Sequence, residues 1–227
     1  MGAVIWFVLS HMEFWLAAVI AYFCGCFNGA VIVSKYILHD DVRTHGSGNA
    51  GLTNFHRTFG GPLTFVVILT DVLKAIVAIL VSVWLGGLFD PRILPTTPLE
   101  NQAMILVFFK YWGGLFCLLG HMFPCMFHFK GGKGILSGGT IAIMIDWRIA
   151  LVVWGGFLVL VVLTRYVSLG SCFAGAAFPV CSLVLYRDGV ITVLALLIGG
   201  LILYMHRGNI HRLLTGTENK LSFHKRK

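Results

Sequence analysis

The stretch LTFVVILTDVLKAIVAILVSVWLG, residues 63–86, decides the fold class. At about 1.5 Å of rise per residue it forms a helix roughly 36 Å long, which is enough to cross about 30 Å of hydrocarbon. Only Asp71 and Lys74 carry charge, and their i, i+3 spacing puts them on one helix face. Charges inside a membrane are costly unless they are paired. We therefore expect a membrane-spanning helix with a structural ion pair between Asp71 and Lys74; a catalytic role for this pair is the alternative.

The rest of the chain has the same apolar character. Of its 227 residues, 58% are hydrophobic and 11% charged, whereas about a quarter of an average soluble domain is charged. This composition argues against a soluble globular enzyme and against a disordered chain. We predict an all-α, polytopic integral membrane protein with one domain over residues 1–227. The expected seven spans are 13–34, 63–86, 103–121, 134–146, 148–164, 168–186 and 189–205. The fourth, with about a dozen residues, is short, tilted or partly re-entrant; its fusion with the fifth into one long span, which would leave six spans, is the alternative.

The distribution of basic residues predicts the number of spans and their orientation. With seven spans, twelve of the 17 Lys and Arg residues lie on one side of the membrane, and only Arg92, Arg148 and Arg187 lie in the loops of the other. The positive-inside rule then places the N-terminus outside and the C-terminus in the cytoplasm. Six spans would move the basic tail outside, which the same rule disfavours. The twelve are Lys35, Arg43, Arg57, Lys130, Lys133, Arg165, Arg207, Arg212, Lys220, Lys225, Arg226 and Lys227.

The cysteines indicate neither a disulfide framework nor a metal site. All six are scattered, mostly within apolar runs, where cysteine behaves as a small hydrophobic residue. Cys24 and Cys26 form a C-x-C pair, but no second Cys or His pair lies nearby to complete a zinc site. We expect no metal.

The loop 43–57, RTHGSGNAGLTNFHR, has the composition of an anion site. Glycines let backbone N–H groups converge on an anion, and hydroxyls, amides and arginines add donors suited to phosphate oxygens. No acidic residue occurs between positions 42 and 70. A plain polar turn between two spans is the alternative, but a turn needs far fewer such residues. The candidate phosphate ligands are Arg43, Gly46, Ser47, Gly48, Asn49, Thr53, Asn54 and Arg57.

A second glycine-rich loop lies in GHMFPCMFHFKGGKGI, residues 120–135. Its candidates Gly131, Gly132, Lys133 and Gly134 precede the fourth span, where a helix N-terminus offers unpaired N–H groups. The order of residues is not that of a P-loop, so a nucleotide does not follow. A flexible basic loop that binds anionic lipid headgroups is the alternative.

Two further segments place polar residues at the same side of the membrane. In TRYVSLGS, residues 164–171, Ser168 and Ser171 share a helix face; a helix cap at Ser168 is the alternative. In YMHRGNIHRLLTGTENKL, residues 204–221, His206 and Asn209 share a face where the last span ends. An ordinary basic juxtamembrane helix is the alternative for this segment.

Four blocks, in this order, resemble the bacterial acyl-phosphate-dependent glycerol-3-phosphate acyltransferases. They are GSGNAGLTN with RTFG, GHMFP with FKGGKG, RYVSLGS, and HRGN with RLLTGTE, and DVLK at 71–74 fits as well. The resemblance implies a multi-pass enzyme of the bacterial inner membrane with a cytoplasmic active site. It would transfer an acyl group from fatty acyl phosphate to the 1-hydroxyl of glycerol 3-phosphate, giving lysophosphatidic acid and phosphate in the first acylation step of phospholipid biosynthesis.

The same resemblance implies partners and residue roles. The partners would be the two substrates, membrane lipids and the enzyme that produces acyl phosphate, with no cofactor and no nucleic acid. His206, Asn209, Ser47 and Lys133 would be catalytic, and Ser171 would join the two loops in substrate binding. The acyl chain would lie in an apolar groove between spans. Either His206 or a phosphate oxygen of the substrate would take the proton, and the absence of a visible side-chain triad favours the phosphate.

Two points qualify this assignment. Gly208 stands where the family has a Glu, which removes a carboxylate beside His206. A membrane transporter or flippase for a phosphorylated metabolite or lipid is the alternative function, because glycine-broken spans and basic cavities suit that class as well. A transporter would carry anion-binding residues on both sides of the membrane, whereas the motifs here all face one side.

Overall fold

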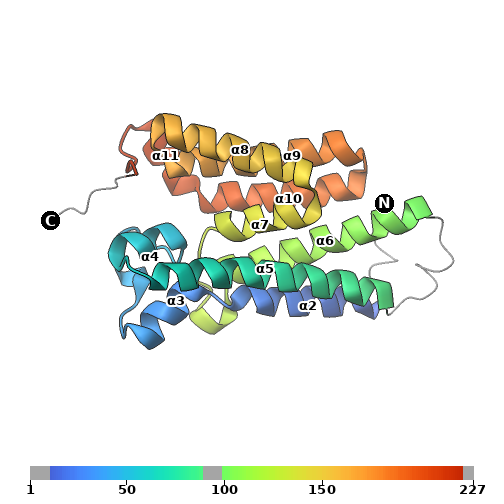
Figure 1. The fold of residues 1–227 in the computed structure, drawn as a ribbon, viewed down its shortest axis with the longest axis horizontal. Coiled ribbons are helices and arrows are strands. Elements are labelled where there is room, and N and C mark those ends of the chain that lie inside the picture. Colours follow the sequence, from blue (N-terminus) through green and yellow to red (C-terminus); the bar gives the residue numbers. More distant parts are fainter. Residues whose placement is uncertain (1–10, 89–98, 222–227) are drawn as a thin grey trace. The chain divides into compact units, whose positions relative to one another are not determined.

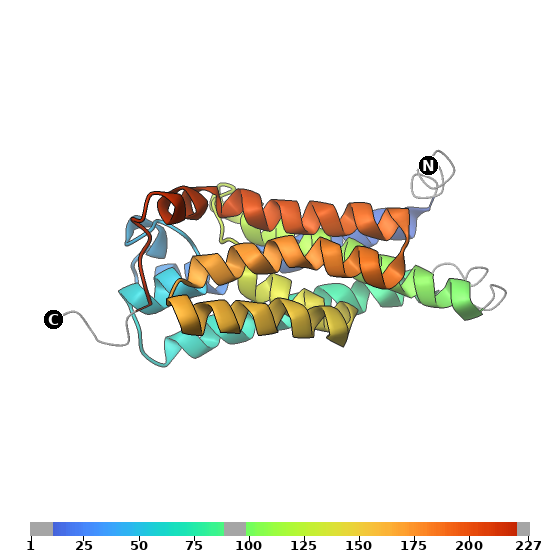
Figure 2. The same cartoon turned by 90° about the horizontal axis from the view of Figure 1, so that it is seen from above.

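The computed structural model describes residues 11–88 and 99–221, and every regular element in these ranges is helical (Figures 1 and 2). The chain divides into two compact units, Met1–Ile145 and Asp146–Lys227. The single domain expected over 1–227 stays a prediction.

Three long helices build the first unit, and they pack against one another. They are α2 (Met12–Cys26), α5 (Leu63–Leu88) and α6 (Leu99–Met122). The shorter α7 (Ile135–Ile145) packs against α5 and α6. Short elements fill the connections: α3 (Gly29–Ile32), a π-helical turn (Val33–Ile37), the 3-10 turn η2 (Val42–Thr44), α4 (Leu52–Thr58) and the 3-10 turn η3 (Cys125–Phe127). In Figure 1, α3 and α4 lie together at one end of this unit.

Asn28 interrupts the first span. Its Oδ1 accepts the backbone N–H of Val31 at 3.1 Å and so caps α3, while its Nδ2 donates to the carbonyl of Ala50 at 3.0 Å. The buried side chain therefore starts a new helix and also anchors the loop that follows. The span predicted over 13–34 is a broken helix within the apolar segment Met12–Ile37.

Glycines bring α2 and α6 close together. A Cβ added to Gly25 would collide with the carbonyl of Cys117, and one added to Gly120 would collide with the carbonyl of Tyr22. Each helix thus places a glycine against the backbone of the other, which is a common contact between membrane helices.

The described part of the second unit, up to residue 221, consists of four consecutive helices. They are α8 (Trp147–Thr164), α9 (Val167–Tyr186), α10 (Gly189–Met205) and the short α11 (Arg207–Leu214). Asp188 caps α10 by accepting the N–H of Ile191 at 2.9 Å. The C-terminal segment returns to the start of α9, where the N–H of Leu221 donates to the carbonyl of Arg165 at 2.7 Å. This return brings the segment after α11 to the α8–α9 turn.

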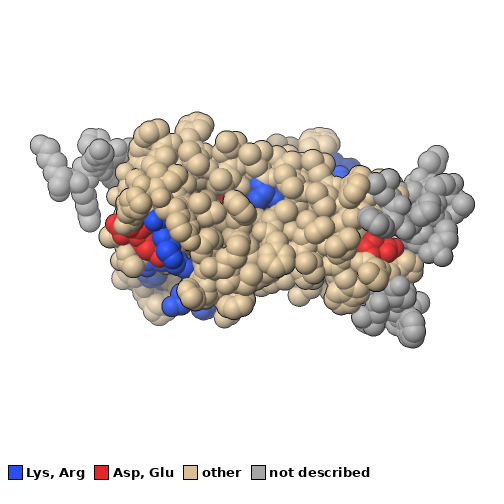
Figure 3. Space-filling view, turned by 90° about the horizontal axis from the view of Figure 1, so that it is seen from below, with Lys and Arg blue, Asp and Glu red and all other residues tan. Residues whose placement is uncertain are grey.

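Length and composition support a multi-pass membrane protein. Among the described residues, five helices are long and apolar enough to span a membrane, or six if α10 and the bent α11 count as one span. Large apolar side chains point outward from them, such as Phe65 at 77% exposure and Leu163 at 75%. On the face in Figure 3, charged side chains gather mainly at the end that carries α3 and α4, and the middle carries little charge.

The fourth predicted span is a short helix. With 11 residues, α7 falls below the spanning length, and the extended residue Asp146 separates it from α8. The fourth and fifth spans are therefore separate helices, and the alternative in which they fuse into one long span is wrong. Seven spans and their orientation stay predictions.

Candidate active site

The two glycine-rich loops meet at one end of the first unit. Arg43 donates from Nη1 to the carbonyl of Phe127 at 2.9 Å and of Lys130 at 3.4 Å, so a side chain of the first loop holds the backbone of the second. The same guanidinium binds Asp41 through Nε at 2.9 Å and Nη2 at 2.7 Å. These hydrogen bonds from Arg43 hold the pKa of the Asp41 carboxyl below its ordinary value. Arg43 therefore joins the loops, and its predicted contact with substrate stays a prediction.

Asn54 shapes the first loop from inside. It is 2% exposed, its Nδ2 donates to the carbonyls of Val42 and His45 at 3.0 Å each, and its Oδ1 accepts the N–H of Ser47 at 3.0 Å. Gly46 has a φ of +56° and lies directly against this Oδ1, where a Cβ would collide. Asn54 and Gly46 thus serve the loop conformation, and their roles as substrate ligands stay predictions.

Other candidates in the first loop face outward. Ser47 and Gly48 are exposed and Asn49 is half-buried. Thr53 and Arg57 are exposed one turn apart on α4, so they share a face of that helix. This set offers hydroxyl, amide and guanidinium donors at an accessible surface, as an anion site requires.

The second loop is laid along the end of α6. The N–H of Gly131 donates to the carbonyl of Met122, and that of Gly132 donates to the carbonyl of His121, each at 3.1 Å. Gly134 has a φ of +75°, and α7 begins one residue later. Lys133 is half-buried just before the N-terminus of α7, where helix dipole and ammonium charge favour an anion together.

A buried charged cluster lies next to this loop. Lys74 Nζ is 2.6 Å from Asp71 Oδ1, which confirms the predicted ion pair. The same Nζ is 2.6 Å from Nδ1 of His121 and donates to the carbonyl of Phe27 at 3.2 Å. His121 was not among the predicted site residues, although its GHMFP block was part of the resemblance.

In the second unit, Ser171 lies on α9 with its Oγ bonded to the carbonyl of Val167 at 2.9 Å. Ser168 is 6% exposed on the same face, and its Oγ has no hydrogen-bond partner among the described residues. The helix begins at Val167 with Tyr166 in the capping position, so the alternative reading of Ser168 as the cap is wrong.

His206 and Asn209 are oriented by specific partners. His206 Nδ1 is 2.8 Å from the carbonyl of Ile202; because a carbonyl only accepts, Nδ1 carries a proton, and in the neutral ring Nε2 is the acceptor nitrogen. Asn209 donates from Nδ2 to Glu218 Oε1 at 3.0 Å, and Arg212 Nε donates to Glu218 Oε2 at 2.7 Å.

Glu218 is a functional candidate that the sequence analysis did not single out. It is the only acidic residue after Asp188 in a basic tail, which was a usable signal. The carboxylate expected at position 208 is missing, and Glu218 supplies one to Asn209 from the segment that follows α11.

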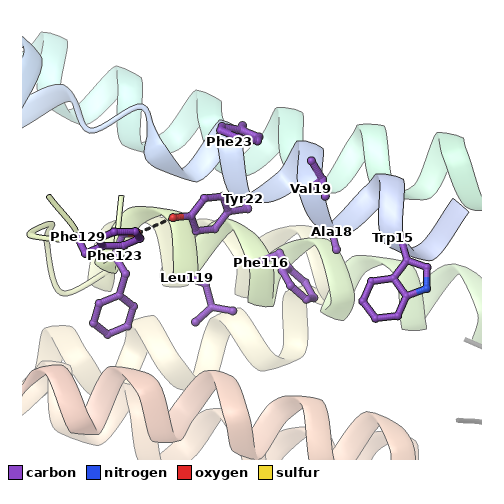
Figure 4. A pocket seen from close by; sticks show the side chains of 9 residues that line it. All are labelled: Trp15, Ala18, Val19, Tyr22, Phe23, Phe116, Leu119, Phe123 and Phe129. Carbon is purple, nitrogen blue, oxygen red and sulfur yellow. Dashed lines mark hydrogen bonds between the residues drawn. The ribbon is translucent and has the colours of Figure 1, made fainter. Parts of the chain in front are cut away.

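An apolar groove of about 580 Å³ lies between α2 and α6 (Figure 4). The Tyr22 hydroxyl donates to the carbonyl of Phe123 at 2.7 Å beside it, and Phe129 at its edge directly precedes Lys130 of the second loop. The groove is lined by Trp15, Ala18, Val19, Tyr22, Phe23, Phe116, Leu119, Phe123 and Phe129.

Fold and side chains together define an all-helical integral membrane protein whose polar loops gather cationic, amide and hydroxyl donors. Residues 15–216 match the family model described as glycerol-3-phosphate acyltransferase, and the chain belongs to this family of acyltransferases.

Similar proteins cover nearly the whole chain. A glycerol-3-phosphate acyltransferase of Thermoanaerobacter sp. (strain X514) is 35% identical over 206 residues, which are 91% of this chain and 94% of that protein. One from Fusobacterium nucleatum subsp. nucleatum is 32% identical over 212 residues, covering 93% of this chain and 100% of that protein.

Among solved structures, this chain is similar to crystal structures of PlsY, an integral membrane glycerol 3-phosphate acyltransferase. Its glycerol 3-phosphate form has a TM-score of 0.76 and 30% identity, covering 92% of this chain and 96% of that one. Its lysophosphatidic acid form has a TM-score of 0.73 and 29% identity, covering 92% and 95%.

Proposed function

We propose that this protein transfers an acyl group from fatty acyl phosphate to the 1-hydroxyl of glycerol 3-phosphate. The products are lysophosphatidic acid and phosphate, in the first acylation step of phospholipid biosynthesis. One observation carries the proposal: two glycine-rich loops with Lys and Arg side chains meet, joined by Arg43, and both substrates bear phosphate. Relatives named as glycerol-3-phosphate acyltransferases support it.

The residues divide into ligands and loop supports. Ser47, Thr53, Arg57 and Lys133 hold the phosphates, with the backbone N–H groups of both loops. Ser171, His206 and Asn209, in the second unit, stay predicted substrate-binding and catalytic residues on the family resemblance. Arg43 and Asn54 act by fixing the first loop, because their polar groups are used there.

The reaction needs orientation more than activation. An acyl phosphate is a mixed anhydride, so the 1-hydroxyl oxygen attacks the carbonyl carbon, a new ester C–O bond forms, and the bond to phosphate breaks. Lys133 and Arg57 neutralise the departing phosphate, and backbone N–H groups stabilise the oxyanion.

The hydroxyl proton goes to a phosphate oxygen of the substrate or to His206. The Nδ1–H form of His206 leaves Nε2 with a lone pair, which suits the base role as well as a hydrogen bond to substrate. Replacing His206 with Ala separates the two. A near-total loss of kcat with glycerol 3-phosphate binding intact favours His206 as the base, and a modest loss favours the phosphate.

The acyl chain fits the apolar groove between α2 and α6. Its edge at Phe129 adjoins Lys130, so an acyl phosphate could place its headgroup at the second loop and its tail along α2. A fatty chain in a membrane is already out of water, so the groove would contribute packing contacts and placement of the donor rather than a large hydrophobic affinity.

The protein lies in a bacterial inner membrane, and its active site faces the cytoplasm. It crosses the membrane seven times, with the N-terminus outside and the C-terminus inside. The one-sided distribution of basic residues supports this orientation. It counts α7 as a span, although 11 residues extend only about 17 Å. Membrane lipids surround the protein. The enzyme that makes acyl phosphate is a partner that delivers this acyl donor to the protein.

Turnover by the purified protein tests the proposal. We expect labelled glycerol 3-phosphate to yield lysophosphatidate with acyl phosphate and none with acyl-CoA, the matched donor control. Absence of product with both donors contradicts the proposal and favours the transporter alternative. Product with acyl-CoA and none with acyl phosphate contradicts the proposal that acyl phosphate is the acyl donor.

A further inference from the structure

Three titratable side chains lie buried behind the second glycine-rich loop. Asp71, Lys74 and His121 are 3%, 6% and 2% exposed. Lys74 Nζ lies 2.6 Å from both Asp71 Oδ1 and His121 Nδ1, and His121 Nδ1 is 3.6 Å from Asp71 Oδ1. Burying such groups among helices is costly, and the proposed acyl transfer does not use them. Their presence therefore calls for another role.

The cluster is bonded to the elements from which both loops arise. Lys74 donates to the carbonyl of Phe27, at the break of the first span, at 3.2 Å. The carbonyl of Asp71 accepts the hydroxyl of Ser137, on α7, at 3.1 Å. The first loop follows the broken span, and the second loop connects α6 to α7.

His121 links the cluster to Gly132 of the second loop. Lys74 can only donate, so Nδ1 of His121 accepts and its proton lies on Nε2. That Nε2 lies directly against Gly132, where an added Cβ would collide with it, and the carbonyl of Ala50 is 2.7 Å from the same Cβ position. The main chain of His121 also accepts the N–H of Gly132 at 3.1 Å. Gly132 is therefore held between the His121 ring and the first loop.

We propose that Asp71, Lys74 and His121 are positioning residues for the phosphate site. The ion pair fixes the tautomer and orientation of His121, His121 fixes Gly132, and Gly132 sets the placement of Lys133, its neighbour in the chain. None of the three touches substrate. This inference rests on the proposed function, because it assigns the cluster to the substrate phosphate that Lys133 binds.

Two substitutions of His121 separate positioning from bulk stability. His121→Asn keeps an acceptor at the Nδ1 position for Lys74 and removes the group facing Gly132. His121→Gln places an amide nitrogen where Nε2 lies. Ser82→Ala is the matched control, because it removes a buried polar group of α5 whose hydroxyl donates to the carbonyl of Ala78 in the same helix, away from the cluster.

The readout is the split between KM and kcat. We expect His121→Asn to raise the KM of at least one phosphate substrate by roughly tenfold or more, since small displacements of positioned groups have effects of this size. Its kcat and thermal unfolding temperature stay near those of the control, and His121→Gln recovers most of the affinity. Unchanged KM values in folded His121→Asn overturn the proposal. So does a loss of kcat with both KM values unchanged, because that indicates a role in the chemistry.

The double variant Asp71→Asn with Lys74→Met provides a second test if His121→Asn does not fold. It removes both charges together, which avoids a single unpaired buried charge. We expect the same rise in KM, and unchanged KM values contradict the proposal.

Binding of inorganic phosphate separates this inference from the proposed function. If the wild type forms no lysophosphatidate, the proposed function fails, and the dissociation constant of inorganic phosphate becomes the readout. Weaker phosphate binding by His121→Asn than by Ser82→Ala then supports positioning, and equal binding overturns it.

Discussion

Replacing Glu218 with Gln tests how the second unit holds its polar residues. Glu218 accepts from Arg212 Nε at 2.7 Å and from Asn209 Nδ2 at 3.0 Å, one donor on each carboxylate oxygen. A glutamine has only one oxygen, so one of the two donors faces an NH₂ group instead. The substitution therefore breaks one bond and turns Asn209 or Arg212 away from its place.

The size of the expected loss of stability depends on how exposed the Glu218 and Arg212 side chains are. A hydrogen bond to a charged group contributes about 1.5–3 kcal/mol when it is buried. The Glu218 side chain is 8% exposed but that of Arg212 is 37%, so solvent screening reduces the loss. We expect a destabilisation of about 1–2 kcal/mol, which lowers the thermal unfolding temperature by about 2–8 °C for a chain of this size. Because Asn209 and Arg212 share this carboxylate, the loss of either bond disturbs the support of Asn209, and we expect turnover to fall as well.

Thermal unfolding in detergent and lysophosphatidate formation are the two assays. Thr217→Ala is the matched control, since among the described residues the exposed Thr217 hydroxyl bonds to Thr215, at 2.9 Å, within the same segment. Glu218→Gln with the unfolding temperature and turnover of the control would refute this account of Asn209.

Three further predictions concern the loops and the helices. Arg43 lowers the pKa of Asp41, so this pair contributes its full stability above the ordinary pKa of 3.8 and loses it as the pH falls through the lowered pKa. Asp41→Asn should lower the stability of the protein at pH 7 and weaken the loss of stability in acid. A pH profile of unfolding equal to that of the wild type would contradict this. Gly120→Leu should destabilise the first unit by roughly 1–3 kcal/mol or more, because its side chain meets the backbone of Tyr22; unfolding equal to that of Gly155→Leu, where no atom lies within 4 Å of the Cβ, would exclude close packing at Gly120. Gly208→Ala should stabilise α11 by up to about 1 kcal/mol, because its Cβ meets only Arg212 Nη1 at 3.7 Å; a lower unfolding temperature would show that the flexibility of Gly208 is needed.

Contiguous features were predictable from the sequence. The span predicted over 189–205 matches α10, and that over 63–86 lies within α5, because an apolar run has the length of the helix it forms. The ion pair between Asp71 and Lys74 followed from helical spacing alone. His121 did not, since 47 residues separate it from Lys74 and only the packing of α5 against α6 brings them together.

Residue type predicted the polar loops but not the use of each side chain. Arg43 and Asn54 have the chemistry of phosphate ligands, yet their donors hold loop carbonyls. Glycine composition pointed toward the loops, whereas Gly25 and Gly120 lie between packed helices. Such assignments depend on which backbone groups lie nearby, and that is decided by the tertiary fold.

The most direct test of the central claim is lysophosphatidate formation from acyl phosphate and glycerol 3-phosphate by Lys133→Met and Arg57→Met, one from each loop. If the two loops form one phosphate site, each substitution lowers kcat/KM by roughly tenfold or more while the protein stays folded. Wild-type kcat/KM in both folded variants would contradict the claim that these loops bind the substrates.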